Sequence, residues 1–419
     1  MTSSSKFLSL PNDLLSSLVV DWLISMDLIL LDNAVCHKVS RIQWLKLLKD
    51  DCVFSHISLD NKRDCRWFIN RQVRTRNLSL YNSKLFDDAA IMQWLLETSQ
   101  FVITLGLYGT DAPQVVDILS SCRNLKNLSI RYCSINAALL NGICGHASLQ
   151  QLTLYYCQFI CNHSPGASNL RKLNIAVPWE AFADIDFAMR QFPCLQSVTV
   201  GVFQLPNNYI LPTELCPHLV ELDLTNMCHC AEDNAGFCNL MRSLKTGLRR
   251  LILPKRHCFT HRELQSIVQF HSHNLQHLGI ADPSYKTCLY SATELADLIR
   301  GIPHLHTLLV PVTRLHALHA HNITITSASI IHLLIDFDSA TATQLLPDLA
   351  GQFPAMTKLS LRWTSVLSAL ADLCTFLAQR PLITTVYIDD KKVREQLRTV
   401  VPHIKVLEYD YLDKCSYSY

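Results

Sequence analysis

The sequence predicts an α/β solenoid, a horseshoe with a parallel β-sheet on its concave face and helices on its convex face, preceded by a small all-α module. Three observations predict this fold: an apolar pattern that recurs over residues 76–410, amphipathic stretches between its units, and a different apolar spacing over residues 10–50. Hydrophobic residues make up 49% of the 419-residue chain at a formal net charge of +2, which excludes a mainly disordered protein.

The charge balance and the cysteines narrow the class of protein further. Lys and Arg number 37 against 35 Asp and Glu, which argues against binding to nucleic acid or to an anionic membrane surface. We expect no membrane helix and no signal peptide, because no uncharged apolar stretch is long enough and no basic segment precedes one. The 17 Cys lack the spacing of a small secreted scaffold and indicate reduced thiols in the cytoplasm or nucleus.

The first 75 residues do not follow the repeat. Residues 1–9 are predicted to be disordered, and residues 10–50 to form a small helical module in which Pro11 suits a helix start. About 40 residues bury too little surface to be stable alone, so we expect the module to pack on a partner or on the first repeats. Residues 51–75, with Trp67 and Arg71, are predicted to be a helical connector or cap.

From residue 76 the pattern apolar-x-x-apolar-x-apolar organises the chain. About 14 units recur at intervals of 21 to 30 residues. Alternating apolar residues predict a short strand with one buried face, and one such unit cannot bury that face without a neighbour. The units are Leu78/Leu80, Leu105/Leu107, Leu125/Leu128/Ile130, Leu149/Leu152/Leu154, Leu170/Leu173/Ile175, Leu195/Val198/Val200, Leu219/Leu222/Leu224, Leu248/Leu251/Leu253, Leu275/Leu278/Ile280, Leu305/Leu308/Val310, Ile330/Leu333/Ile335, Met356/Leu359/Leu361, Ile383/Val386/Ile388 and Ile404/Leu407/Tyr409.

Amphipathic stretches between these strands predict helices. Residues 263–270 carry apolar side chains on one face, with Thr260 as the N-cap, and residues 293–299 and 366–378 are similar. Strand, turn and helix in each unit give a parallel sheet backed by helices. The alternative is a Leu-rich solenoid made of helices alone. Residues 411–419 are predicted to be a C-terminal tail.

These units resemble the leucine-rich repeat family. Cys133 and Cys157, three residues past the last apolar strand position, match its cysteine-containing subtype. The N-terminal pattern, LP-x-D-LL followed by an apolar stretch, D-L and V-C, resembles the F-box. Together they give the order of leucine-rich-repeat F-box proteins. The residues that carry the F-box resemblance are Leu10, Pro11, Leu14, Leu15, Leu28, Val35 and Cys36.

The resemblance implies a substrate-recognition subunit of an SCF-type cullin–RING ubiquitin ligase. In that family the F-box binds the Skp-type adaptor, and the repeats hold a protein substrate for ubiquitination and degradation. The alternative is a repeat scaffold for protein interactions, in which the N-terminal helices only cap the solenoid. The sequence does not name the bound protein.

Exposed positions of the predicted strands suggest where a protein partner binds. Residues at the same repeat position form a ladder across the sheet, because neighbouring strands lie about 4.8 Å apart. Directly after the buried strand residues, the first rungs of this ladder are Tyr81, Tyr108, Arg131 and Tyr155. Tyr and Arg dominate binding hot spots, so we predict partner binding here. Alternatively, these side chains merely cover the exposed face.

Catalytic and metal motifs give a weaker signal. The sequence has no GxGxxG, GxxxxGK[ST], GxSxG or HExxH motif. Cys228, His229, Cys230 and Cys238 lack the usual spacing of zinc ligands and are interpreted as buried or loop thiols. We therefore predict a non-enzymatic protein-binding adaptor with no catalytic residue, no metal and no cofactor.

Overall fold

The structure is a computed structural model of the 419-residue chain. It describes residues 29–32, 35, 38–46, 48, 53–54, 56–109, 114–160, 168–177, 182–201, 216–225, 235–244, 247–253, 259–280, 291–311, 315, 318, 323, 325, 327–337, 351–363, 370–388 and 390–408. The chain divides into two compact units, residues 1–196 with 215–218 and residues 197–214 with 219–419.

Parallel strands form the sheet of the first unit. Its strand order is β10-β8-β6-β5-β4-β2, so each neighbour in the sheet belongs to the next repeat along the chain. The register joins equivalent positions, with Leu105 beside Leu128 and Leu128 beside Leu152. The strands are β2 (Ile57–Leu59), β4 (Asn77–Leu80), β5 (Thr104–Tyr108), β6 (Asn127–Arg131), β8 (Gln151–Tyr155) and β10 (Lys172–Ala176), and small pairs are made by β1 (Val53–Phe54) with β3 (Arg74–Thr75) and β7 (Ser134–Ile135) with β9 (Gln158–Phe159).

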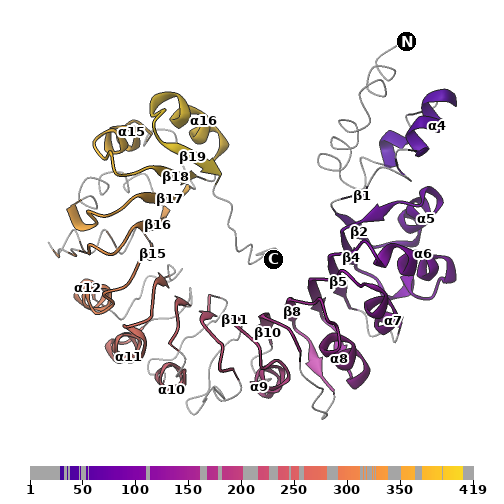
Figure 1. Ribbon diagram of the computed structural model, residues 1–419, viewed down its shortest axis with the longest axis horizontal. Coiled ribbons are helices and arrows are strands. Elements are labelled where there is room, and N and C mark those ends of the chain that lie inside the picture. The colour runs from indigo at the N-terminus through magenta and orange to yellow at the C-terminus, as the bar shows by residue number, and fades with distance from the viewer. Residues whose placement is uncertain are drawn as a thin grey trace. The chain divides into compact units, whose positions relative to one another are not determined.

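Helices cover one face of this sheet. Figure 1 shows α5 to α8 in a row on one side of the strands. Side-chain caps set the helix starts: Asn61 accepts from the Asp64 N–H, and Asp88 accepts from the N–H groups of Ala90 and Ile91. The elements are α4 (Lys38–Lys46), α5 (Lys62–Arg71), η2 (Ser83–Leu85), α6 (Ala89–Ser99), α7 (Gln114–Ser121), α8 (Ala137–Cys144) and α9 (Phe182–Gln191).

The second unit repeats the same plan. Its strands run in the parallel order β19-β18-β17-β16-β15-β14-β13-β12-β11. They are β11 (Ser197–Gly201), β12 (Glu221–Asp223), β13 (Arg250–Ile252), β14 (His277–Gly279), β15 (Thr307–Pro311), β16 (His332–Phe337), β17 (Lys358–Trp363), β18 (Thr385–Ile388) and β19 (Lys405–Glu408). The helices are α10 (Ala235–Ser243), α11 (His261–His271), α12 (Ala292–Arg300), α15 (Leu370–Ala378) and α16 (Lys391–Val400).

The predicted core positions are buried. Every apolar position of the pattern from Leu78 to Ile388 is at most 5% exposed. The predicted N-cap Thr260 is confirmed, and it forms a reciprocal capping box with Glu263 at the start of α11. The parallel strands exclude the all-helical alternative in the described residues. Stacked strand–helix units of this kind are consistent with a leucine-rich-repeat solenoid.

Two details at the ends differ from the sequence prediction. The sheet begins with β2, one strand before Leu78, because Ile57 and Leu59 already alternate as buried residues within the predicted connector. In the last unit the register is shifted by one residue: Val406 pairs with Val386 and is 5% exposed, where Leu407 was predicted. Tyr409 lies outside the described residues. The horseshoe curvature stays a prediction.

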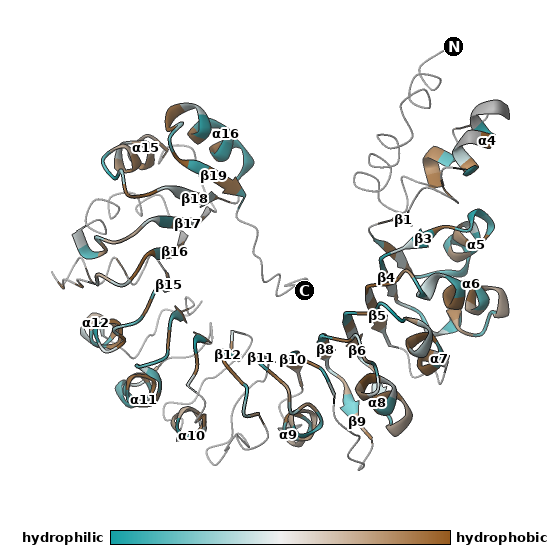
Figure 2. Ribbon diagram, viewed as in Figure 1, coloured by the Kyte–Doolittle hydropathy of each residue, from teal (hydrophilic) through white to brown (hydrophobic). Residues whose placement is uncertain are grey.

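The helix α16 has a polar outer side. Figure 2 shows α16 as mainly hydrophilic, and within it Val393 and Leu397 are buried. Its apolar residues therefore pack into the repeat while its polar residues face solvent.

None of the helices in the described part of the chain has the length and apolar character that crossing a lipid bilayer requires.

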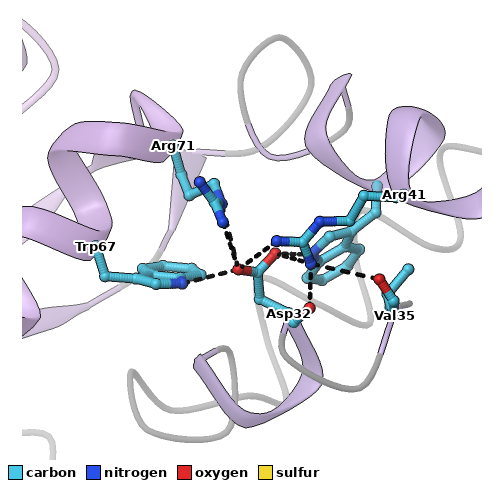
Figure 3. A network of polar contacts seen from close by, with 6 residues as sticks. Asp32, Val35, Arg41, Trp67 and Arg71 are labelled. Carbon is cyan, nitrogen blue, oxygen red and sulfur yellow. Dashed lines mark hydrogen bonds and ion pairs between the residues drawn. The ribbon is translucent and has the colours of Figure 1, made fainter. Parts of the chain in front are cut away.

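A buried carboxylate joins the N-terminal residues to the first helix of the repeats (Figure 3). Asp32 is 0% exposed. Its Oδ1 accepts from the Trp44 Nε1–H at 2.9 Å and lies 2.7 Å from the Arg41 guanidinium. Its Oδ2 accepts from Trp67 Nε1–H at 2.9 Å and from Arg71 Nη2 at 3.0 Å, both on α5. Residues far apart in sequence are thus held by one side chain.

This network sets the ionisation of Asp32. Burial acts to raise the pKa of Asp32, but the hydrogen bonds from Arg71 and Trp67 and the charges of Arg71 and Arg41 outweigh it. The pKa therefore lies below its ordinary value, and the carboxylate is charged at neutral pH. A charged group without solvent contact is stable here because two cations and two indole N–H groups surround it.

We predict that Asp32→Asn lowers the free energy of unfolding by about 2–3 kcal/mol at pH 7, because it leaves two partly exposed cations, Arg41 and Arg71, without their buried counter-charge. The lowered pKa stabilises the fold fully above the unfolded value of about 4, and this contribution falls as pH decreases through the native pKa. Urea unfolding of both proteins between pH 7 and pH 3 would measure this. A gap between them that does not shrink toward pH 3 would contradict the assignment.

Candidate functional site

One cluster of aromatic side chains and an arginine lies on the first unit, and we call it the aromatic patch. It consists of Tyr81, Tyr108, Arg131, Tyr132, Tyr155 and Tyr156. Five of the 13 tyrosines of the chain are therefore gathered at the ends of four neighbouring strands, β4, β5, β6 and β8. No other described part of the chain shows as many tyrosines in ring contact with one another.

The sheet itself aligns the rungs of the patch. Tyr108 pairs with Arg131, and Arg131 pairs with Tyr155, as the ladder predicts. Tyr81 directly follows Leu80, which pairs with Leu107, so it occupies the same position one strand earlier. Side chains alternate between the faces of a strand, and the neighbours Leu107, Ile130 and Leu154 point into the core under the helices. The patch therefore lies on the face opposite the helices.

The side chains of the patch contact one another without interruption. The rings of Tyr81 and Tyr108 stack with centroids 4.1 Å apart. The Arg131 guanidinium carbon lies 5.2 Å from the Tyr108 ring centroid and 5.5 Å from that of Tyr155. Both distances fall within the range of a cation–π contact. Arg131 thus links the aromatic pair at one end to the tyrosines at the other.

Tyr132 and Tyr156 complete the second end. Their rings lie nearly parallel, at 4° with centroids 5.8 Å apart, and each meets the Tyr155 ring edge-on, at 5.9 Å and 4.6 Å. They remain accessible, with exposed fractions of 61% for Tyr132 and 45% for Tyr156. The patch therefore presents large aromatic surface to solvent while its rings hold one another in place.

The backbone at these two tyrosines is unusual. Tyr132 has φ of 55° and Tyr156 has φ of 51°, both in the left-handed region. The preceding repeat has Gly109 at the same place, with φ of 58°. The hydrogen bonds show that the positions are equivalent, since each N–H donates to the next strand: Gly109 to Arg131 O, Tyr132 to Tyr155 O and Tyr156 to Ala176 O.

A left-handed residue other than glycine costs about 1–2 kcal/mol. The turn is required because it aims the next residue inward: Cys133 and Cys157 are 4% and 3% exposed. Their Sγ atoms contact backbone carbonyls, with Cys133 at 3.1 Å from Arg131 O and Cys157 at 3.2 Å from Ile130 O. Both thiols are therefore buried beneath the turn. The turn explains the conformation, but it does not explain why tyrosine rather than glycine occupies it.

The patch carries one cation and a set of hydroxyl donors at neutral pH. Burial, together with a hydrogen bond to Tyr81, raises the pKa of Tyr108 to about 12. Burial and the neighbouring Tyr156 and Tyr132 also raise the pKa of Tyr155. Both phenols therefore stay protonated across the physiological range, and the patch contains no carboxylate. Its chemistry is neutral aromatic surface, hydroxyl groups and a single guanidinium.

The corresponding face of the second unit has different chemistry. One row joins Arg250, His277, His332 and Lys358 through the register of β13 to β17, with Thr307 between the two histidines. Burial and the neighbouring Lys358 lower the pKa of His332 to about 4, so it is neutral at physiological pH. Its Nε2 lies 2.8 Å from Ser360 Oγ. Positively charged side chains lie at the two ends of this row, with neutral side chains between them. The described residues of the second unit contain no cluster of tyrosines like the aromatic patch.

The structure brings together all four residues predicted to bind a partner, Tyr81, Tyr108, Arg131 and Tyr155. Sequence reasoning missed Tyr132 and Tyr156. A signal existed, because Gly109 directly follows β5 at the position that Tyr132 takes after β6 and Tyr156 takes after β8. Asp32 was also missed, because the residues that surround it come from two helices, α4 and α5, that are separate in the sequence. For the predicted site residues, contact is established here and the binding role stays a prediction.

Of the residues predicted to bind the Skp-type adaptor, the structure describes only Val35. Its side chain is 7% exposed. Leu10, Pro11, Leu14, Leu15, Leu28 and Cys36 lie outside the described residues. So do Cys228, His229 and Cys230, whereas Cys238 on α10 is buried. The described residues contain no group of three or more His, Cys, Asp or Glu side chains that could hold a metal ion.

Comparisons with known proteins add little to this geometry. No protein-family model matches the sequence, and no curated protein matches it. Among solved structures, the chain is similar to an internalin from Listeria monocytogenes, with a TM-score of 0.30 and 13% sequence identity over 84% of this chain and 76% of that one. A likeness this low carries no argument, so the repeat fold rests on the strands, register and buried positions described above.

We predict that glycine is better tolerated than alanine at Tyr156. Both substitutions remove the ring contacts, but alanine retains the left-handed strain, so Tyr156→Gly should be more stable than Tyr156→Ala by about 1 kcal/mol. Urea unfolding of the two variants measures the difference. Gly109→Ala is the matched control: its Cβ would meet nothing within 4 Å, so any loss of stability reports backbone strain alone. Equal stabilities of the two Tyr156 variants would contradict this account.

Proposed function

We propose that this chain is a non-catalytic adaptor that binds another protein through the aromatic patch. The observation that carries the proposal is the continuous contact from the Tyr81–Tyr108 stack through Arg131 to the tyrosines at the other end. Tyr and Arg are enriched among the few residues that dominate binding energy in protein interfaces, and these residues cluster near the interface centre. A group with three exposed tyrosines, Tyr81, Tyr132 and Tyr156, around the half-buried Tyr108, Arg131 and Tyr155 suits that role.

The preformed geometry favours binding. Side chains that order on association cost about 0.5–1.5 kcal/mol each. The rings of the patch already pack on one another and on the guanidinium, so less of this cost remains to be met when a partner arrives. The residues on which it is built belong to strands with fixed register, which places them on a rigid support.

We further propose that the partner is a substrate for ubiquitination and that the N-terminal residues recruit the Skp-type adaptor of an SCF ligase. The support is the sequence resemblance of residues 10–36 to the F-box, followed by repeats. Catalysis would then occur by proximity, with no reactive residue in this chain, in the cytoplasm or nucleus.

Two features of the N-terminal residues bear on the proposed recruitment of the Skp-type adaptor. Leu30 and Ile42 are 61% and 62% exposed, so apolar surface is available there for a partner. The Asp32 network holds the same region on α5, which supports the alternative of a helical cap on a plain binding scaffold. Capping and adaptor binding are compatible, because the buried carboxylate and the exposed apolar side chains are different surfaces.

For the binding role, we predict that Tyr108→Ala/Arg131→Ala loses the main proteins captured from a lysate by the intact chain. The expected loss is at least tenfold in recovered partner, because both a hot-spot ring and the central cation are removed. Quantitative affinity purification measures it. Tyr387→Ala in the second unit is the matched control and should retain the partners. Unchanged recovery with the double variant would exclude the patch as the binding site.

For the ligase role, we predict that the full chain co-purifies with a recombinant Skp-type adaptor, and that Leu14→Asp or Ile42→Asp abolishes this. Point variants are preferable to deletion of residues 1–50, because deletion also removes Asp32 and uncovers α5. Ile331→Asp, at an exposed position of the second unit (40%), is the control. No adaptor bound by the intact chain would leave the plain scaffold as the function.

A further inference from the structure

The chemistry of the aromatic patch points to a particular class of peptide ligand. The patch offers aromatic rings, one guanidinium that can only donate hydrogen bonds, and phenol hydroxyls that can donate or accept them, and none of its six side chains is a carboxylate. The nearest rung before Tyr81 is Asp60, which is exposed and directly follows β2. A ligand that matches this surface has apolar rings or flat faces to stack and unpaired carbonyl groups to accept hydrogen bonds.

A polyproline II segment has both properties. It forms no internal backbone hydrogen bonds, so its carbonyl groups are free to accept from side chains. An α-helix, in contrast, pairs its carbonyl groups within itself and could offer the patch only side chains. Proline rings also stack on aromatic faces, and this is the basis of recognition in aromatic-lined grooves for proline-rich ligands.

The spacing of the ladder fits the same conformation. Tyr108 and Tyr155 lie on β5 and β8, which are separated by β6, so they are about 9.6 Å apart at about 4.8 Å per strand. Polyproline II repeats every three residues, or about 9.3 Å at 3.1 Å per residue. In an extended β-strand, side chains on one face repeat about every 6.8 Å. This spacing matches neither one strand interval of about 4.8 Å nor two of about 9.6 Å.

The left-handed tyrosines support a ligand-binding role for the surface. Gly109 shows that glycine can make the same turn, and a Cβ added there would meet nothing within 4 Å. Tyr132 and Tyr156 nevertheless occupy this strained conformation, and their side chains remain exposed beside Tyr155. Residues held in such conformations occur most often at binding and active sites. They widen the aromatic surface at the end where the ladder has its last tyrosine.

We propose that the aromatic patch binds a proline-rich segment in the polyproline II conformation, lying across the strands. Because Tyr81 and Arg131 cover the two faces of the Tyr108 ring, residues i and i+3 of the segment pack on the outward edges of the Tyr108 and Tyr155 rings. Arg131 donates to a carbonyl group between them. From Tyr81 to Tyr155 the ladder spans about 14 Å, which accommodates about five residues at 3.1 Å each. Tyr132 and Tyr156 contact the end of the segment. This inference rests on the proposed protein-binding function and names the class of partner.

The test is calorimetric titration of the full chain with three ten-residue peptides. They are decaproline, a peptide with proline at every third position, and an alanine-rich helical peptide. We expect the two proline peptides to bind with affinities within about fivefold of each other and the helical peptide not to bind. Tyr108→Ala/Tyr155→Ala should weaken binding of decaproline at least tenfold, and Tyr132→Gly/Tyr156→Gly at least threefold. Tyr387→Ala should leave the affinity unchanged.

The outcomes separate this inference from the function on which it rests. Thermal unfolding of each variant shows that loss of binding is not loss of fold, and the glycine variants are suited to this because they relieve backbone strain. If decaproline does not bind while the patch variants lose their lysate partners, the polyproline proposal is overturned and the binding function stands. If the helical peptide binds at this patch instead, the proposal is equally overturned. If neither peptides nor lysate partners depend on the patch, both proposals fail.

Discussion

Each repeat of this protein has an apolar strand face that it can bury only against the helix of its own unit and the neighbouring repeats. This constraint decides most of what is seen. It places Leu128 beside Leu152 in the sheet and keeps the pattern positions from Leu78 to Ile388 away from solvent. The opposite face of each strand does not pack against the helices. Its side chains are therefore not restricted to apolar residues that fill the core, and in the first unit they include the tyrosines of the aromatic patch.

The two outer parts of the described array shield their apolar residues in different ways. Toward the C-terminal side, α16 presents a mainly polar surface and buries a few residues such as Val393 and Leu397. Toward the N-terminal side, β2 adds a strand before the first predicted repeat, and Asp32 joins α4 to α5 by ion pairs and indole hydrogen bonds. This contact is specific, since loss of the buried carboxylate leaves two guanidinium groups without their counter-charge.

The turns at the strand ends set the chemistry of the exposed face. The turn after β6 and β8 must be left-handed so that Cys133 and Cys157 reach the core, and glycine would make that turn with the least strain. Tyrosine at this position places a ring beside the ladder of Tyr81, Tyr108 and Tyr155, where Arg131 connects the two halves. Repeats that share one backbone can thus differ in a single turn residue and acquire an exposed aromatic surface at small cost in stability.

The sequence alone determined the repeat, its buried positions, the capped helices and the ladder that contains Tyr108, Arg131 and Tyr155, because these follow from local periodicity and a fixed strand spacing. The tertiary structure decided what depends on contacts between distant residues or on backbone angles. Periodicity could not show that Val406, not Leu407, pairs with Val386, since one residue of turn length sets that register. Nor could it show that Asp32 meets Trp67, or that Tyr132 and Tyr156 adopt positive φ and stack on each other. Those features arise when separate segments are brought together, and their energies come from burial and shared contacts that no single stretch of sequence contains.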